Sequence, residues 1–202
     1  MKVFVTVNNV KDSGQRVGDL ETDKPRERNS GWYVLVDSAV SNTGKPFYAP
    51  DHLGKVTVSL SPVIRIDRLG KSVAEKFAHR YFHTMAPGVH FRLSELAQQL
   101  KEDGLPMDAS VNFDRSLFVG DYEPFETDSH YQIIVNGELK AEWNVDSLKK
   151  TIGELLSEIS RLNTVKMGDL LIPGLSGETE IKRGDLIEVR KDNQEAFRIK
   201  VK

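Results

Sequence analysis

The sequence contains no cysteine, and this absence removes several kinds of chemistry. Disulfide cross-links, thiolate nucleophiles and zinc sites built from thiolates are all excluded. A chain without cysteine suits a reducing compartment, and we expect a cytoplasmic protein. The sequence also has no apolar run of roughly 18 residues, so we expect no membrane-spanning helix, and the apolar stretch after Met1 is too short for a signal peptide.

An excess of one charge is lacking as well. The 28 basic and 30 acidic residues leave a formal net charge of −2. This balance is not typical of a nucleic-acid surface or a polybasic membrane anchor, so we expect neither partner. The hydrophobic fraction of 39% and the charged fraction of 29% are ordinary for a globular protein. The length of 202 residues suits one domain, which we place over residues 1–202.

The segment 8–30 differs from the rest of the chain because it is polar and has almost no apolar periodicity. Such a composition is typical of a mobile surface loop. A long loop in a compact domain often covers a pocket, so a lid is the second interpretation.

The stretch 52–91 organises the predicted fold. Apolar and polar residues alternate from 56 to 66, which predicts a half-buried strand. Pro62 interrupts this pattern, and proline has no N–H group to donate to a neighbouring strand. We therefore expect this strand to lie at a sheet edge or to be bulged at Pro62.

A helix is predicted over 72–83, after a turn at Leu69-Gly70. Ser72 is the expected N-cap, and Glu75 follows at the spacing of a capping box. The residues expected to face the core are Val73, Phe77 and Tyr81. His79 and His83 lie one turn apart and could hold a metal ion, but no acidic ligand follows on that turn, so a structural role is favoured.

The remaining patterns favour many short strands and few helices. An amphipathic helix is predicted from Leu93 to Gly104. A hairpin is predicted over 131–143, around the turn pair Asn136-Gly137. Another helix is expected to begin at Asp146 or Ser147, with a core stripe formed by Leu148, Ile152, Leu155, Ile159 and Leu162. Since strands and helices do not alternate regularly, the fold class is α+β, mostly β.

Several segments, in order, resemble the fumarylacetoacetate hydrolase family. They are RLGKSVAEKFAHRYF, GLPMDASVNFDRSLFVGDY, VNGELKAEWNVDSL and IKRGDLIEV. The likeness is strongest to the short, single-domain branch, which includes acylpyruvate hydrolases, oxaloacetate decarboxylases and hydroxyhepta-dienedioate isomerases. The resemblance implies a mixed β-sandwich roll with a few peripheral helices, paired as a homodimer. It also implies a Mg²⁺ or Mn²⁺ ion held by a Glu-x-Glu pair and an Asp.

The positions that match those three metal ligands carry other residues. The Glu-x-Glu pair falls on Ser59 and Ser61, and the Asp falls on His90. Two hydroxyls and an imidazole carry none of the negative charge with which carboxylates bind Mg²⁺. We therefore expect the family's metal to be lost and no cofactor to replace it.

The positions that match the family's catalytic residues have changed too. The lysine position is occupied by Val111, which can neither donate a hydrogen bond nor carry charge. On the lid, Asn9 matches the family pattern, but Ser13 stands at the histidine and Arg16 at the glutamate. An isolated serine hydroxyl is no general base at neutral pH. The family's Thr-Gly-Thr-Pro loop reads 173–176, Pro-Gly-Leu-Ser.

These replacements predict a catalytically inactive member of the fold, a pseudoenzyme with a binding or interaction role. Its partners would be a second copy, an active paralogue or a small anionic ligand. The predicted ligand pocket consists of Ser59, Ser61, His90, Val111, Phe113 and Asp114.

Other interpretations remain open. The chain could be a hydrolase, isomerase or decarboxylase for a β-dicarbonyl or 2-oxo acid, with a divergent, metal-free site. Its chemistry would then come from His90, His83 and Asp114, with Arg65 or Arg92 binding an anionic substrate, because arginine can hold a carboxylate without metal. A conventional metal site elsewhere and a purely structural role are the last alternatives.

Overall fold

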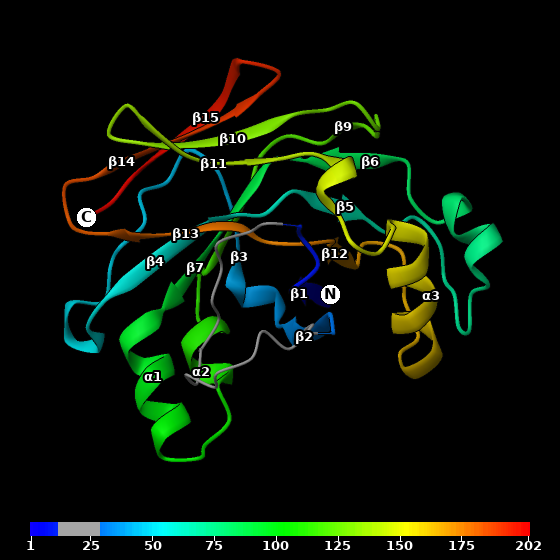
Figure 1. The fold of residues 1–202 in the computed structure, drawn as a ribbon, viewed down its shortest axis with the longest axis horizontal. Coiled ribbons are helices and arrows are strands. Elements are labelled where there is room, and N and C mark those ends of the chain that lie inside the picture. Colours follow the sequence, from blue (N-terminus) through cyan, green and yellow to red (C-terminus); the bar gives the residue numbers. More distant parts are fainter. Residues whose placement is uncertain (12–28) are drawn as a thin grey trace.

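The computed structural model describes residues 1–11 and 29–202, which form three β-sheets with short helices at the periphery (Figure 1). This is the α+β, mostly β architecture that the sequence predicts. Most of the predicted lid or mobile loop over 8–30 lies outside the described residues, as do Ser13 and Arg16. Among the described residues, no helix is long and apolar enough to cross a membrane.

The largest sheet has six strands in the order β2-β1-β12-β5-β6-β9. They are β1 (Val3–Val7), β2 (Gly31–Leu35), β5 (Val63–Arg65), β6 (Thr84–Ala86), β9 (Glu123–Pro124) and β12 (Leu170–Ile172). Alternate residues of β1 enter two separate hydrophobic clusters, with Phe4 in one and Val3 and Val5 in the other. The centre of this sheet is therefore buried on both faces.

The other two sheets complete the roll. One has five strands, ordered β13 (Ser176–Ile181), β4 (Val56–Leu60), β7 (Gly88–Leu93), β8 (Leu117–Val119) and β3 (Val40–Asn42). The other has four, ordered β11 (Glu138–Trp143), β10 (Tyr131–Val135), β14 (Leu186–Lys191) and β15 (Gln194–Lys200), and it crosses the top of the molecule in Figure 1. The predicted hairpin is confirmed as β10 and β11, with positive φ at Asn136 and Gly137 as its tight turn requires.

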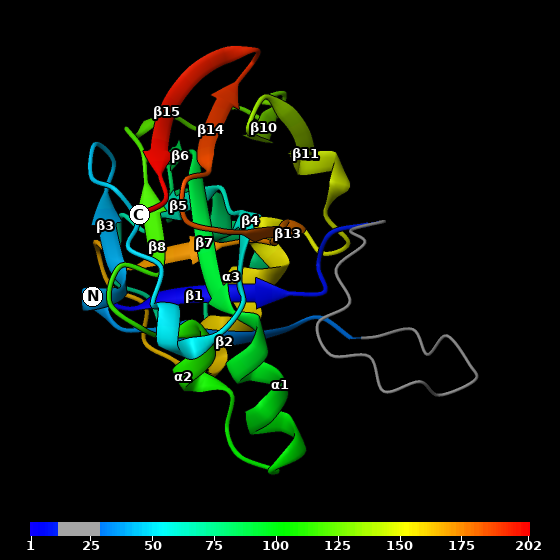
Figure 2. The same cartoon turned by 90° about the vertical axis from the view of Figure 1, so that its left-hand side faces the viewer.

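The helices are short and lie outside the sheets. The α-helices are α1 (Ser94–Glu102), α2 (Asp108–Val111) and α3 (Ile152–Leu162), and the 3-10 helices are η1 (Asp37–Ala39), η2 (Asp51–Leu53), η3 (Glu75–Arg80) and η4 (Val145–Ser147). Helices α1 and α2 lie together at one end of the molecule (Figure 2), and α3 packs against η3. The amphipathic helix predicted over 93–104 is confirmed as α1, and Gly104 follows it with a φ of 67°.

At Pro62 the chain passes from one sheet to another. Strand β4 lies between β13 and β7 in the five-stranded sheet, whereas β5 lies between β12 and β6 in the six-stranded sheet. The prediction of an edge strand is therefore wrong, and the irregularity at Pro62 is a passage between two sheets rather than the expected bulge. Proline is tolerated in this interior position because the ladder is already interrupted between Leu60 and Val63.

The segment 72–83 differs from its prediction. Only the 3-10 helix η3 forms, and no side chain caps it. The backbone N–H of Ser72 instead donates to the carbonyl of Ser160 at 2.9 Å, and Ser72 has a φ of 52°. This attachment to α3 replaces the predicted cap. Phe77 is 42% exposed rather than buried, between the cations of Lys76 and Arg80 at 5.0 Å each.

Helix α3 begins later than predicted. Thr151 accepts from the N–H of Glu154, and the Glu154 carboxylate accepts from the N–H of Thr151, so these two residues form the capping box. The residues proposed as caps, Asp146 and Ser147, belong to η4 instead. Leu162 was predicted to be the last residue of the core stripe, and this is also wrong, because it ends the helix and is 75% exposed.

Candidate functional site

On one face of the five-stranded sheet, β4 and β7 carry polar side chains, and this polar face forms the candidate site. Ser59 on β4 lies directly opposite His90 on β7, and Thr57 lies opposite Arg92. Because side chains alternate along a strand, Val58 points into the main hydrophobic cluster and its polar neighbours point the other way. Both Ser59 and His90 are buried.

A cavity of about 270 Å³ lies on this polar face. Strands β1, β2, β4, β7 and β13 and helix α2 supply most of its described wall, and the residues just before α2 and β13 add Met107 and Leu175. Among the described residues, the apolar lining consists of Val7, Met107, Val111 and Leu175, and the other lining residues are Tyr33, Ser59, His90, Arg92, Asp108 and Glu178. A mostly apolar wall with a few polar groups is typical of a small-molecule site.

His90 is held in a neutral state. Its Nε2 lies 3.3 Å from the carbonyl oxygen of Val111, and since a carbonyl can only accept, Nε2 carries the proton. Burial lowers the pKa of His90 to about 4, against the effect of the Val111 hydrogen bond and assisted by the positive charge of Arg92. The imidazole is therefore uncharged at pH 7.

Arg92 and Glu178 form an ion pair in the cavity wall. The Nη1 of Arg92 lies 3.3 Å from the Oε1 of Glu178, and the two side chains are 15% and 18% exposed. The hydroxyl of Thr57 donates to the same carboxylate oxygen at 2.8 Å. The Nε–H of Arg92 is enclosed by protein atoms and has no partner among the described residues. The charge of Arg92 is thus paired with that of Glu178, although its Nε–H lacks an acceptor among the described residues.

Tyr33 lies near His90, Arg92 and Glu178. Its ring is 6.1 Å from the ring of His90. Burial raises the pKa of Tyr33, the charge of Arg92 opposes that rise, and the charge of Glu178 adds to it. The phenol is therefore a neutral hydroxyl at every physiological pH.

Three of the six predicted pocket residues line the cavity, namely Ser59, His90 and Val111. Ser61 is fully buried outside the lining, and its hydroxyl donates to the carbonyl of Ser59 at 3.1 Å. Phe113 packs against the main hydrophobic cluster, and Asp114 is exposed to solvent.

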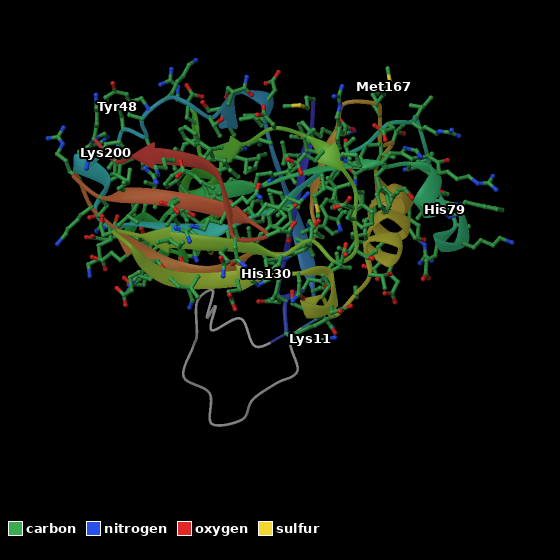
Figure 3. All side chains as sticks on the ribbon, turned by 90° about the horizontal axis from the view of Figure 1, so that it is seen from above. Lys11, Tyr48, His79, His130, Met167 and Lys200 are labelled. Atoms are coloured by element: carbon green, nitrogen blue, oxygen red, sulfur yellow. The ribbon has the colours of Figure 1, made fainter. Side chains whose placement is uncertain are left out.

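Most residues of the metal-free alternative lie elsewhere. His83 forms a 2.8 Å contact with Asp67 at the surface, and Arg65 lies 5.8 Å from the ring of Tyr122. Arg92 and His90 do line the cavity. Exposed His79 lies at the rim of the molecule (Figure 3). In the described part of the chain, no three His, Asp or Glu side chains gather closely enough to hold a metal ion.

Asn9, the matching lid position, has a structural role. Its amide donates to the carbonyls of Pro173 at 2.8 Å and Lys150 at 3.0 Å, and it accepts from the N–H of Lys150 at 2.9 Å. It thereby holds the loop before β13, which carries the lining residue Leu175.

The residues present do not fit the divalent ion that the resemblance implies. The two serine positions supply neutral hydroxyls, and that of Ser61 is enclosed and already used. His90 supplies an imidazole whose Nε2 is engaged by Val111. A hard cation needs oxygen ligands with negative charge, and none of these three positions provides it.

Sequence reasoning missed several lining residues. Tyr33 and Glu178 come from strands that are distant in sequence from β4 and β7, and no local pattern marks either of them. For the site as a whole, the sequence offered one local signal: His90 and Arg92 are two residues apart on the strand β7, so their side chains lie on the same face of the sheet.

Comparisons with known proteins agree on the family. The family model "Fumarylacetoacetate (FAA) hydrolase C-terminal" matches residues 2–202. The mitochondrial oxaloacetate tautomerase of Mus musculus is 27% identical over 176 residues, which cover 84% of this chain and 80% of the relative. A fumarylpyruvate hydrolase of Ralstonia sp is 25% identical over 161 residues, covering 77% of this chain and 84% of the relative.

Solved structures share the fold. The fumarylpyruvate hydrolase from Pseudomonas aeruginosa, in complex with Mn²⁺ and pyruvate, superposes with a TM-score of 0.86 at 20% identity, over 100% of this chain and 89% of that one. The 2-hydroxyhepta-2,4-diene-1,7-dioate isomerase from Mycobacterium marinum superposes with a TM-score of 0.81 at 19% identity, over 99% of this chain and 73% of that one. The resemblance read from the sequence is confirmed: the chain belongs to the fumarylacetoacetate hydrolase family.

Proposed function

We propose that this protein is a catalytically inactive member of its family that binds a small molecule in the cavity on β4, β7 and β13. The observation that carries the proposal is the state of His90. By the family resemblance this residue stands at the position of a metal-binding aspartate, and in the structure it is buried, neutral and hydrogen-bonded to Val111. A side chain used in this way holds the cavity wall together rather than a metal.

The relatives described above are named as a tautomerase, a hydrolase and an isomerase. A metal-free version of such chemistry is the second candidate, because Arg92 and His90 share the cavity. It is less well supported, since a histidine with a pKa of about 4 is a weak base at neutral pH. The pairing of Arg92 with Glu178 also opposes the binding of a substrate carboxylate.

Association with a second chain is part of the proposal as well. We expect a homodimer, or a complex with an active paralogue, and a cytoplasmic location. The expected homodimer comes from the family resemblance and the expected location from the composition. Measurement of the molecular mass in solution tests whether the chain forms a dimer.

Turnover assays test the proposal. The full chain is incubated with oxaloacetate or an acylpyruvate, with and without Mg²⁺ or Mn²⁺, and we expect rates equal to those without protein. Turnover that disappears in the variants Ser59→Ala or His90→Gln would overturn the proposal.

A reconstruction provides the positive control. The quadruple variant Ser59→Glu, Ser61→Glu, His90→Asp and Val111→Lys restores the residue types that the family uses. We expect it to gain Mg²⁺ affinity. If the folded variant binds no metal, the correspondence between these positions and the family's ligands is wrong.

A further inference from the structure

The size of the cavity limits what it can hold. An apolar cavity of about 150 Å³ accommodates a benzene molecule. The cavity here has about 270 Å³ and is lined on several sides by Val7, Met107, Val111 and Leu175. It therefore has room for one aromatic ring with a short substituent.

The described part of the wall offers an anion no cation that lacks a partner. Among the described lining residues, Arg92 is the one positive group and Glu178 and Asp108 are negative, so these residues carry a net charge of −1 with His90 neutral. The ion pair of Arg92 with Glu178 is itself anchored by Thr57. A carboxylate entering the cavity would meet the Glu178 charge or would have to displace it. An uncharged ligand is not repelled by Glu178 and does not have to break its ion pair with Arg92.

The hydroxyl of Tyr33 is a neutral donor available to such a ligand. The hydroxyl of Tyr33 has no hydrogen-bond partner among the described residues, and it is not one of the enclosed polar atoms. Tyr33 lines the cavity. A phenol donates one hydrogen bond, so it would select a carbonyl, ether or hydroxyl oxygen.

From this geometry we propose that the cavity binds an uncharged, largely apolar molecule, about one substituted ring in size, whose single oxygen acceptor faces the hydroxyl of Tyr33. This inference rests on the proposed function and names its ligand class. It differs from the oxo-acids after which several relatives are named, because a carboxylate would meet no unpaired cation among the described lining residues.

Three matched probes test the proposal. Acetophenone is a neutral ring with one carbonyl, phenylglyoxylate replaces its methyl group by a carboxylate, and ethylbenzene lacks the oxygen. Each is titrated into the full chain at pH 7.5, and affinity is measured by NMR chemical-shift changes. We expect acetophenone to bind at least tenfold more tightly than phenylglyoxylate, and more tightly than ethylbenzene.

Two variants and one control show whether the probes bind in this cavity. Tyr33→Phe should weaken acetophenone about two- to tenfold, the value of one net hydrogen bond, and leave ethylbenzene unchanged. Tyr122→Phe is the matched control, because this tyrosine also has a pKa raised by burial but does not line the cavity, and it should change nothing. Met107→Trp should fill the cavity and weaken both neutral probes.

The outcomes separate this inference from the proposed function. Tighter binding of phenylglyoxylate without turnover would overturn the ligand class and leave the inactive protein standing. Failure of all three probes, or acetophenone binding that neither Tyr33→Phe nor Met107→Trp alters, would also overturn the inference. Turnover of oxaloacetate would overturn the proposed function, whichever probe binds.

Discussion

The ion pair between Arg92 and Glu178 supports a direct prediction about stability. The substitution Glu178→Gln keeps an oxygen that can accept from Thr57 but removes the charge opposite Arg92. Removing one partner of a fully buried pair costs about 3–5 kcal/mol. Here the side chains are 15% and 18% exposed and an amide acceptor remains, so we expect a loss of about 2 kcal/mol. For a chain of this length the melting temperature should fall by roughly 4–8 °C.

Urea unfolding of the variants measures this loss. The pair Lys55–Glu180 is the matched control, because it has the same 3.3 Å separation and shares strand β13, but its side chains are 65% and 60% exposed. Glu180→Gln should therefore cost less than about 1 kcal/mol. Combining Glu178→Gln with Arg92→Met should cost less than the sum of the two single changes. Equal, small effects of Glu178→Gln and Glu180→Gln would refute the view that Arg92 is neutralised within the cavity wall.

Two further predictions concern the same region. Because the pKa of His90 is about 4, the unfolded chain binds this proton below about pH 6.5 and the folded chain does not until about pH 4. The free energy of unfolding should therefore fall by about 2–3 kcal/mol from pH 7 to pH 4.5 because of this residue. In urea unfolding, the variant His90→Gln should lose that much less stability than the original protein over the same pH range. Equal losses in the two proteins would contradict a neutral buried imidazole. Gly88→Ala should cost about 1–3 kcal/mol in the same assay, because its Cβ would lie 2.6 Å from the carbonyl oxygen of Ser61 and 3.1 Å from that of Phe118. Gly31→Ala is its control, since the nearest atom is 3.9 Å away, and an equal cost for both would show that close packing is not the reason.

Local signals predicted the fold where neighbouring residues decide the structure. The turn at Asn136-Gly137 is an example, because positive φ at both residues selects a tight hairpin. The 72–83 segment could not be predicted in this way. Its backbone is held by Ser160, which is 88 positions from Ser72 along the chain, and this tertiary contact overrides the local capping pattern.

The candidate site was predictable only in part, for the same physical reason. Ser59 and His90 meet because β4 and β7 are antiparallel neighbours, as the family resemblance implies. Tyr33 and Glu178 reach the cavity from β2 and β13, and only the assembled sheets bring them there. The pairing of Glu178 with Arg92, which sets the charge of the wall, depends on the same assembly.

The central claim is that the cavity has lost the family's metal chemistry, and calorimetric titration of the full chain with Mn²⁺ at neutral pH tests it most directly. Two hydroxyls and a neutral imidazole should give no saturable binding at micromolar metal. The account predicts heats equal to those of dilution, unchanged in His90→Gln. Saturable binding of one Mn²⁺ per chain at micromolar concentration, abolished by His90→Gln, would contradict it.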